Sequence, residues 1–138
     1  TEAAMLALTN AALRGVDVCL LVPEKSDSRI VTAAARSYFD ELITCGVKVF
    51  EYHQSMLHSK AMVVDDMVGI IGTANFDNRS FRLNYEVCAV VYGEEFAAKL
   101  EQQFVEDLQH ARRVGYARPQ SFWQRLGDSA ARLMSPLL

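Results

Sequence analysis

Stretches of different hydrophobic periodicity divide the first half of the chain into alternating helices and strands. Residues 2–14 are rich in alanine and leucine at the spacing of a short amphipathic helix, which Gly15 is expected to end. Residues 16–22 form a nearly continuous apolar run, typical of a strand covered on both faces of a sheet. A second helix is predicted over residues 28–45, followed after a glycine by a strand over residues 47–52.

The middle of the chain has the pattern of short antiparallel strands. Residues 57–64 are apolar and β-branched enough to predict a strand, and the two aspartates that follow predict a hairpin turn. Residues 67–71 then return to a glycine, and residues 84–92 predict the next strand. Two strands linked by a helix favour a parallel pair, whereas strands linked by short turns are antiparallel. We therefore expect an α/β fold with a mixed β-sheet flanked by helices.

The last part of the chain predicts a long helix and a separate tail. The helix is expected over residues 94–111. Residues 121–138 carry an apolar stripe at helical spacing with arginines beside it, which fits either a helix lying on a bilayer or one packed on its own domain. We accordingly expect a catalytic domain over residues 1–117 and an amphipathic tail over residues 118–138.

One short stretch combines several groups that suit phosphate chemistry. His58, Lys60 and Asp65 follow the pattern H-x-K-x4-D. On a strand, side chains two apart share a face, so His58 and Lys60 should point the same way, with Met62 and Val64 continuing that face inward. A histidine can act as acid, base or nucleophile near neutral pH, and a lysine brings a compact positive charge to a phosphoryl oxygen. Asp65 has the other parity, which indicates a structural role, either fixing the turn or pairing with a distant base.

A glycine-led loop and one glutamate complete the candidate set. The turn at Gly72 can present backbone N–H groups, the Thr73 hydroxyl and the Asn75 amide to an anion. Glu86 on the next predicted strand could bond the far imidazole nitrogen of His58 and orient the ring. Alone, the His-x-Lys pair would be read as a chance occurrence on the surface. The glycine-led loop alone would be read as an ordinary turn. Together, at this spacing, they favour catalysis.

Composition excludes several other classes of function. The net charge of −3 argues against a nucleic-acid binder driven by counterion release, so no specific nucleic-acid partner is expected. Cys19, Cys45 and Cys88 are far apart in apolar stretches, which predicts small buried thiols rather than a disulfide or a zinc site. No apolar run reaches the length of a membrane span.

The run from residue 57 to residue 86 resembles the HKD motif of the phospholipase D superfamily. The flanking sequence is similar, more narrowly, to the C-terminal half of bacterial cardiolipin synthases. Three stretches carry this narrower resemblance: AALRGVDVCLLVPEKSD at residues 11–27, RSYFDELITCGVKVFEY at 36–52 and IIGTANFDNRSFRLNYEV at 70–87.

The resemblance implies a mechanism that spacing alone does not show. Enzymes of this superfamily place two HKD motifs around one active site, related by a pseudo-two-fold axis. One histidine forms a phosphohistidine, and the other protonates the leaving group and then activates the incoming alcohol or water. Lysines and asparagines hold the phosphate, so neither a metal nor another cofactor is expected. By resemblance His58, Lys60 and Asn75 are this chain's contribution, with His58 as acid and base.

Only one such motif is present, because His53 and His110 lack the lysine and aspartate that should follow. The site must therefore be completed by an N-terminal half with a second HKD motif or by a second copy of this chain. The chain begins without a methionine, which favours the first explanation, a fragment of a longer protein.

These observations together predict half of a membrane-associated lipid enzyme. The expected function is a cardiolipin synthase-type transfer of a phosphatidyl group from phosphatidylglycerol to a phospholipid acceptor. The alternatives are a phospholipase D-type phosphodiesterase or nuclease acting as a homodimer, and a non-catalytic module that binds phosphate headgroups. The expected location is the bacterial cytoplasmic membrane, at its anionic surface and through parts absent from this chain.

Overall fold

Two small three-stranded sheets organise the part of the chain that the computed structural model describes, residues 2–26 and 29–115. In the first sheet the central strand β2 pairs parallel to β1 and antiparallel to β6. In the second sheet all pairs are antiparallel, in the order β3-β4-β5. The expected α/β class is confirmed, with the strands divided between two sheets. The strands are β1 (Cys19–Pro23), β2 (Lys48–Tyr52), β3 (Ala61–Val64), β4 (Val68–Gly72), β5 (Cys88–Tyr92) and β6 (Ala111–Arg113).

The connection from β1 to β2 contains two helices where the sequence predicted one. The helices are α2 (Arg29–Ser37) and α3 (Phe39–Thr44), and the break lies at Tyr38. The Tyr38 N–H donates to the carbonyl of Ala35, three residues back, at 3.2 Å. This tighter bond replaces the four-residue spacing of an α-helix, so the axis is interrupted there.

Helix α3 ends at the predicted glycine. Gly46 has φ of +98°, a left-handed conformation that glycine adopts without steric cost. Its N–H donates to Ile43, and the Val47 N–H donates to Leu42, which satisfies the last carbonyls of the helix. The chain then enters β2 directly.

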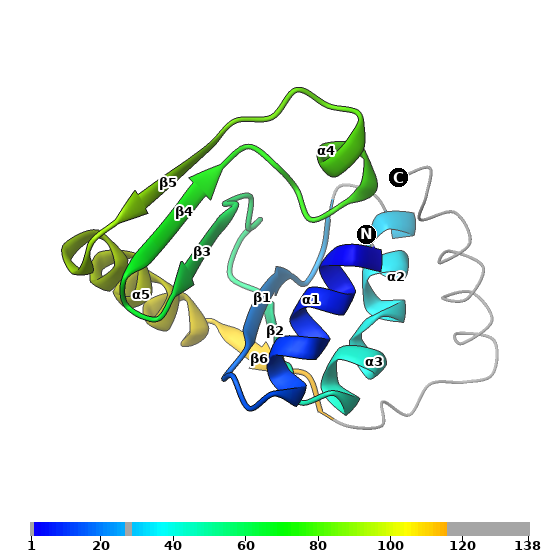
Figure 1. Cartoon of the computed structure of the whole chain (residues 1–138). Helices are drawn as coiled ribbons and strands as arrows, with labels where there is room; N and C mark the ends of the chain where they lie inside the picture. The colour runs from blue at the N-terminus through cyan, green and yellow to red at the C-terminus, as the bar shows by residue number, and fades with distance from the viewer. Residues whose placement is uncertain (1, 27–28, 116–138) are drawn as a thin grey trace.

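The hydrophobic core lies between the first sheet and two helices, α3 and α1 (Glu2–Leu13) (Figure 1). Phe39 and Leu42 of α3 pack with Val49 of β2, and all three are buried. Leu8 of α1 and Leu20 of β1 pack against this cluster. The apolar run of β1 therefore contributes to the core. The strand spans Cys19–Pro23, its Cys19 is exposed and the other residues are only half-buried, so the expectation of a strand covered on both faces is wrong.

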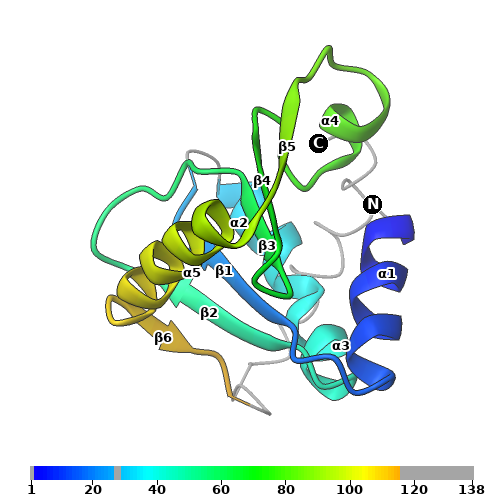
Figure 2. The ribbon, with the colours of Figure 1, turned by 60° about the vertical axis from the view of Figure 1, so that its left-hand side comes forward.

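Helix α5 (Glu94–Leu108) covers one face of the second sheet, and it also contacts β2 and β6 of the first (Figure 2). Phe96 and Leu100 of α5 press on Gly69 of β4, where an added Cβ would lie 2.5 Å from the Phe96 ring. Between β4 and β5 the chain makes an excursion through the short helix α4 (Asn78–Arg82), which projects away from the two sheets (Figures 1 and 2).

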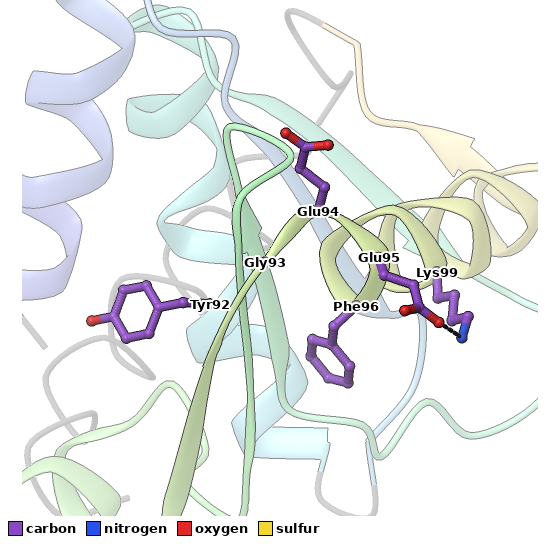
Figure 3. Close-up of a pocket in the computed structure, with 6 residues that line it drawn as sticks. All are labelled: Tyr92, Gly93, Glu94, Glu95, Phe96 and Lys99. Atoms are coloured by element: carbon purple, nitrogen blue, oxygen red, sulfur yellow. Dashed lines mark hydrogen bonds and ion pairs between the residues drawn. The ribbon is translucent and has the colours of Figure 1, made fainter.

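The other face of the second sheet is open and apolar. Met62, Val64, Val90 and Tyr92 are 51, 41, 48 and 80 % exposed. Tyr92 points away from α5, on the opposite side of β5 from Phe96 (Figure 3). The prediction that Met62 and Val64 point inward is wrong. No described element covers their face, because α5 packs on the opposite one. We refer to this surface, Met62, Val64, Val90 and Tyr92, as the open sheet face.

Two further predictions differ from the structure. The helix expected to run to residue 111 ends at Leu108, and Ala111–Arg113 pair with β2 instead. Cys19 and Cys88 are exposed and Cys45 is half-buried, all three as free thiols, so the expectation of buried thiols is wrong. The domain boundary at residue 117 and the tail over residues 118–138 lie outside the described residues.

Candidate active site

The motif residues lie where the chain enters β3. The strand predicted over residues 57–64 begins at Ala61, so His58 and Lys60 belong to the segment that leads into it. The Gly72 N–H donates to the Lys60 carbonyl at 3.0 Å, which continues the β3–β4 pairing by one residue. The His58 side chain is exposed, and its imidazole has no hydrogen-bond partner among residues 2–26 and 29–115. It is therefore accessible to a group from outside.

Lys60 contacts the backbone of His58 and acts on the charge of Glu86, which lies just before β5. Its Nζ donates to the carbonyl oxygen of His58 at 2.7 Å. Its positive charge is also one of the causes that lower the pKa of Glu86. Lys60 thus contacts the backbone of His58 and also acts electrostatically on Glu86.

The loop after β4 is tied closely to the start of β5. The Thr73 N–H donates to the Val87 carbonyl at 3.0 Å, and the Val87 N–H donates to the Thr73 Oγ1 at 3.1 Å. Gly72 sits against the same segment, since an added Cβ would lie 2.6 Å from the Val87 oxygen and 2.5 Å from the Cys88 Sγ. Glycine is required here for this close approach of two backbones.

The Glu86 carboxylate is the centre of a hydrogen-bond network. Thr73 Oγ1 donates to its Oε2 at 2.5 Å, and Ser80 Oγ donates to its Oε1 at 2.9 Å. Asn84 Nδ2 donates to the same Oε1 at 3.3 Å. These bonds, led by the one from Thr73, hold the pKa of Glu86 below its ordinary value because they favour the charged form. No bond joins Glu86 to the His58 ring in the described chain, so the orienting role predicted for Glu86 stays a prediction.

Sequence reasoning missed Ser80 and Asp77. Asp77 is the N-cap of α4 and accepts from the Ser80 N–H at 2.7 Å, while the Ser80 Oγ accepts from the Asn75 N–H at 3.0 Å. An aspartate just before a short polar stretch is a recognisable helix start, so Asp77 could have been found. The link from Ser80 to Asn75 and Glu86 depends on tertiary contact and has no local signature.

The loop presents fewer backbone N–H groups to an anion than the sequence suggested. The N–H groups of Gly72, Thr73 and Asn75 are all used within the fold, by Lys60, Val87 and Ser80 respectively. The single hydroxyl proton of Thr73 goes to Glu86. By contrast, the exposed side-chain amide of Asn75 has no partner in the described part of the chain. Asn75 and Lys60 are thus better placed than Thr73 to meet a phosphate.

Asp65 lies in the predicted turn. Asp65 and Asp66 have φ of 51° and 55°, the left-handed conformation that aspartate tolerates better than most residues. The Met67 N–H closes the turn on the Val64 carbonyl at 3.2 Å. Asp65 is therefore placed to shape the hairpin that carries the motif.

A shallow hollow at the β5–α5 junction lies apart from these residues. It encloses about 510 Å³ and is lined by Tyr92, Gly93, Glu94, Glu95, Phe96 and Lys99 (Figure 3). Its lysine is already paired with Glu95 at 2.7 Å. With two glutamates and one neutralised cation, the hollow does not suit an anionic phosphate group.

Comparison with known proteins assigns the chain to a family. The family model described as "Cardiolipin synthase, PLD-like domain" matches residues 1–108. The chain belongs to this family. The PLD-like domain is 48 % identical to a cardiolipin synthase of Geobacillus kaustophilus over 139 residues, and 45 % identical to cardiolipin synthase A of Pseudomonas putida over 139 residues. Both alignments cover 99 % of the chain, but only 28 % and 29 % of those relatives.

The fold of the PLD-like domain also matches a solved structure. Nuc from Salmonella typhimurium, described as a phospholipase D family member, superposes with a TM-score of 0.70 at 23 % identity. The match covers 80 % of this chain and 72 % of that one. At this identity the likeness concerns the fold, and it confirms the phospholipase D-like architecture expected from the motif.

The described residues contain neither a metal-binding cluster nor a membrane-spanning helix. Within residues 2–26 and 29–115, no cluster of three histidine, cysteine or acidic side chains is arranged to bind a metal ion. In the same part of the chain, no helix combines the length and apolar character needed to cross a membrane.

Proposed function

We propose that the PLD-like domain is the C-terminal catalytic half of a cardiolipin synthase-type phosphatidyltransferase. The observation that carries this proposal is the contact of Lys60 Nζ with the His58 carbonyl, beside an exposed imidazole, in a chain of this family. The loop that carries Asn75 is tied to the Glu86 carboxylate through Ser80. The reaction would move a phosphatidyl group from one phosphatidylglycerol to the terminal hydroxyl of another phospholipid, with release of glycerol.

The first step would use one histidine from each half. The partner histidine attacks phosphorus, so that an N–P bond forms and the P–O bond to the glycerol headgroup breaks. His58 gives its proton to the departing glycerol oxygen. Its exposed ring, without a partner in the described chain, is free to approach that oxygen. Lys60 and Asn75 would hold the non-bridging oxygens as charge develops there.

The second step reverses the roles of the same groups. His58, now neutral, takes the proton from the hydroxyl of the second lipid. That oxygen forms the new P–O bond as the N–P bond to the partner histidine breaks. A water molecule in place of the lipid hydroxyl would give hydrolysis, so the acceptor alone separates a synthase from a phospholipase.

The second half is proposed to pack on the open sheet face. Met62 follows Lys60 by two residues along the extended chain, so this face adjoins the motif. Large apolar groups such as Tyr92, 80 % exposed, are unfavourable in water and mark an interaction surface. The chain spans little more than a quarter of its relatives, which leaves ample sequence for a second half carrying its own motif.

A lipid substrate would place the active site at an anionic bilayer. The sequence left the amphipathic stretch over residues 121–138 open between a membrane contact and packing on its own domain, and this stretch lies outside the described residues. The spanning anchors, and the location at the bacterial cytoplasmic membrane, would come from parts absent from this chain.

The test is the product formed from phosphatidylglycerol vesicles by the full-length protein. Dimeric lipid together with released glycerol is the expected result. Accumulation of phosphatidic acid without dimeric lipid would replace the synthase by a hydrolase. Binding to vesicles with no turnover, and no effect of His58→Ala, would favour a headgroup-binding module.

A further inference from the structure

Ser80 differs from the other polar groups of the site because it is buried. Its exposed fraction is 7 %, whereas Thr73 and Asn75 are exposed. A buried hydroxyl is unfavourable unless its hydrogen-bonding capacity is used. The bonds of Ser80 therefore indicate why a polar residue occupies this position.

The Ser80 hydroxyl both donates a hydrogen bond to, and accepts one from, residues of the candidate site. Its proton goes to Glu86 Oε1 at 2.9 Å, and its oxygen accepts from the Asn75 N–H at 3.0 Å. A hydroxyl has one proton and two lone pairs, so no second proton is available for a substrate. Ser80 thus connects the backbone of the loop at Asn75 with the Glu86 carboxylate, which follows α4 in the chain.

The position of Ser80 is itself held by α4. Asp77 caps the helix and accepts from the Ser80 N–H at 2.7 Å. The chain from Asp77 through Ser80 to Asn75 and Glu86 is thus continuous, and each link is a hydrogen bond of ordinary length. A helix of five residues has little stability of its own, so this chain of bonds is what gives the excursion a defined geometry.

We propose that Ser80 is a positioning residue of the active site, which holds the Asn75 loop and the Glu86 carboxylate in register with Lys60. This inference rests on the proposed function, since it assumes that Asn75 and Lys60 contact the phosphate. Ser80 itself does not touch substrate. Its effect is transmitted through the placement of the Asn75 side chain.

The experiment compares Ser80→Ala and Ser80→Cys in the full-length protein. The cysteine keeps the volume but bonds weakly, so it separates loss of hydrogen bonding from loss of packing. Total consumption of phosphatidylglycerol in vesicles is measured, whichever product forms. We expect kcat to fall about 10- to 100-fold with KM little changed, because small displacements of catalytic groups have effects of that size. Ser37→Ala is the matched control, since Ser37 Oγ donates to the Ala34 carbonyl of α2 and has no other partner in the part of the chain that the structure describes.

A double-mutant cycle distinguishes positioning from general stability. If Ser80 acts through Asn75, then Ser80→Cys combined with Asn75→Ala should be little worse than Asn75→Ala alone. The combination of Ser37→Ala with Asn75→Ala should show no such coupling. Circular dichroism confirms that each variant is folded.

Three outcomes would overturn the inference. The first is a folded Ser80 variant that consumes phosphatidylglycerol within about twofold of the parent, a change too small for a positioning role. The second is a loss in kcat for Ser80→Cys that is as large in the Asn75→Ala background as in the parent. The third is failure of both Ser80 variants to fold, which would make Ser80 a folding residue. A parent that releases phosphatidic acid instead of dimeric lipid would refute the synthase proposal and leave this test intact.

Discussion

At the scale of single residues, the three histidines differ in their surroundings. The N–H of His53 donates to the carbonyl of His110 at 3.2 Å, where β2 meets β6. His58 instead lies just before β3, and its carbonyl accepts from Lys60 Nζ at 2.7 Å. The sequence argument that singled out His58 rests on the lysine two residues after it, and its catalytic role stays a prediction.

We expect His58→Ala in the full-length protein to lower turnover of phosphatidylglycerol by about 10²- to 10⁴-fold, the usual contribution of general acid–base catalysis. His53→Ala is the control and should change turnover little, since His53 belongs to the other sheet. Thermal unfolding of both variants checks the fold. Equal losses in the two variants would contradict the assignment of His58.

Lys60 should be sensitive even to a change that keeps its charge. In Lys60→Arg the planar guanidinium is larger than the ammonium that now donates to His58, so we expect a loss of about tenfold or more in kcat. Lys48→Arg is the control, because Lys48 pairs with Asp17 on the first sheet and should tolerate the exchange. Near-normal activity of Lys60→Arg would mean that Lys60 supplies only bulk positive charge.

At the scale of elements, β5 and the residue before it pack so closely on Gly72 of β4 that no side chain fits at this position. In Gly72→Ala the new Cβ would lie 2.5 Å from the Cys88 Sγ and 2.6 Å from the Val87 oxygen, so the backbone must shift. We expect a loss of about 1–3 kcal/mol in unfolding free energy, together with reduced turnover. In Gly115→Ala the new Cβ would meet no atom of the described residues within 4 Å, so this variant serves as the control. Denaturant unfolding of both variants measures the difference.

The network between β4, α4 and β5 should make the domain sensitive to acid. The pKa of Glu86 is lowered in the folded protein, first by the Thr73 hydroxyl and then by Ser80. A lowered pKa means a contribution to stability that is present above the ordinary glutamate range and is lost as pH falls through the folded-state pKa.

The thermal midpoints of the parent and of Glu86→Gln should therefore converge as pH falls below roughly 4. At neutral pH the parent should be the more stable of the two, because an ionised acceptor strengthens the bonds from Thr73 and Ser80. Parallel pH dependences of the two midpoints would show that these bonds do not depend on the charge of Glu86.

At the scale of the whole molecule, the domain has half of the groups that its proposed chemistry requires. The motif and its loop supply His58, Lys60 and Asn75, next to an open sheet face that no described element covers. Groups that act as a unit lose most of their effect when some are missing. Activity should therefore depend on assembly with a second half.

The isolated chain is expected to show almost no turnover of phosphatidylglycerol as a monomer. Turnover measured across protein concentration, with light scattering to follow association, tests this. Activity that appears only with a dimer would indicate that two copies complete the site. Robust turnover by a monomer, independent of concentration, would contradict the half-site.

Sequence alone determined the features that depend on neighbours a few residues away. The glycine after α3, the left-handed Asp65-Asp66 turn and the spacing of His58 and Lys60 are all local, so their physical causes are visible in the printed residues. The family assignment followed from the same local signals. Such features involve backbone conformation and side-chain chemistry over a single turn or hairpin.

Only the tertiary structure decided the features that join distant parts of the chain. Ala111–Arg113 become a strand because β2 offers them a partner, and Arg112 pairs there with the buried Glu51 at 3.1 Å. The apolar alternation of Met62 and Val64 marked a face but could not show that α5 would cover the opposite one. The partners of Glu86 were likewise hidden, since Thr73 and Ser80 reach it only when the excursion folds back. Contacts of this kind depend on which elements pack together, and that is a property of the whole fold rather than of any local pattern.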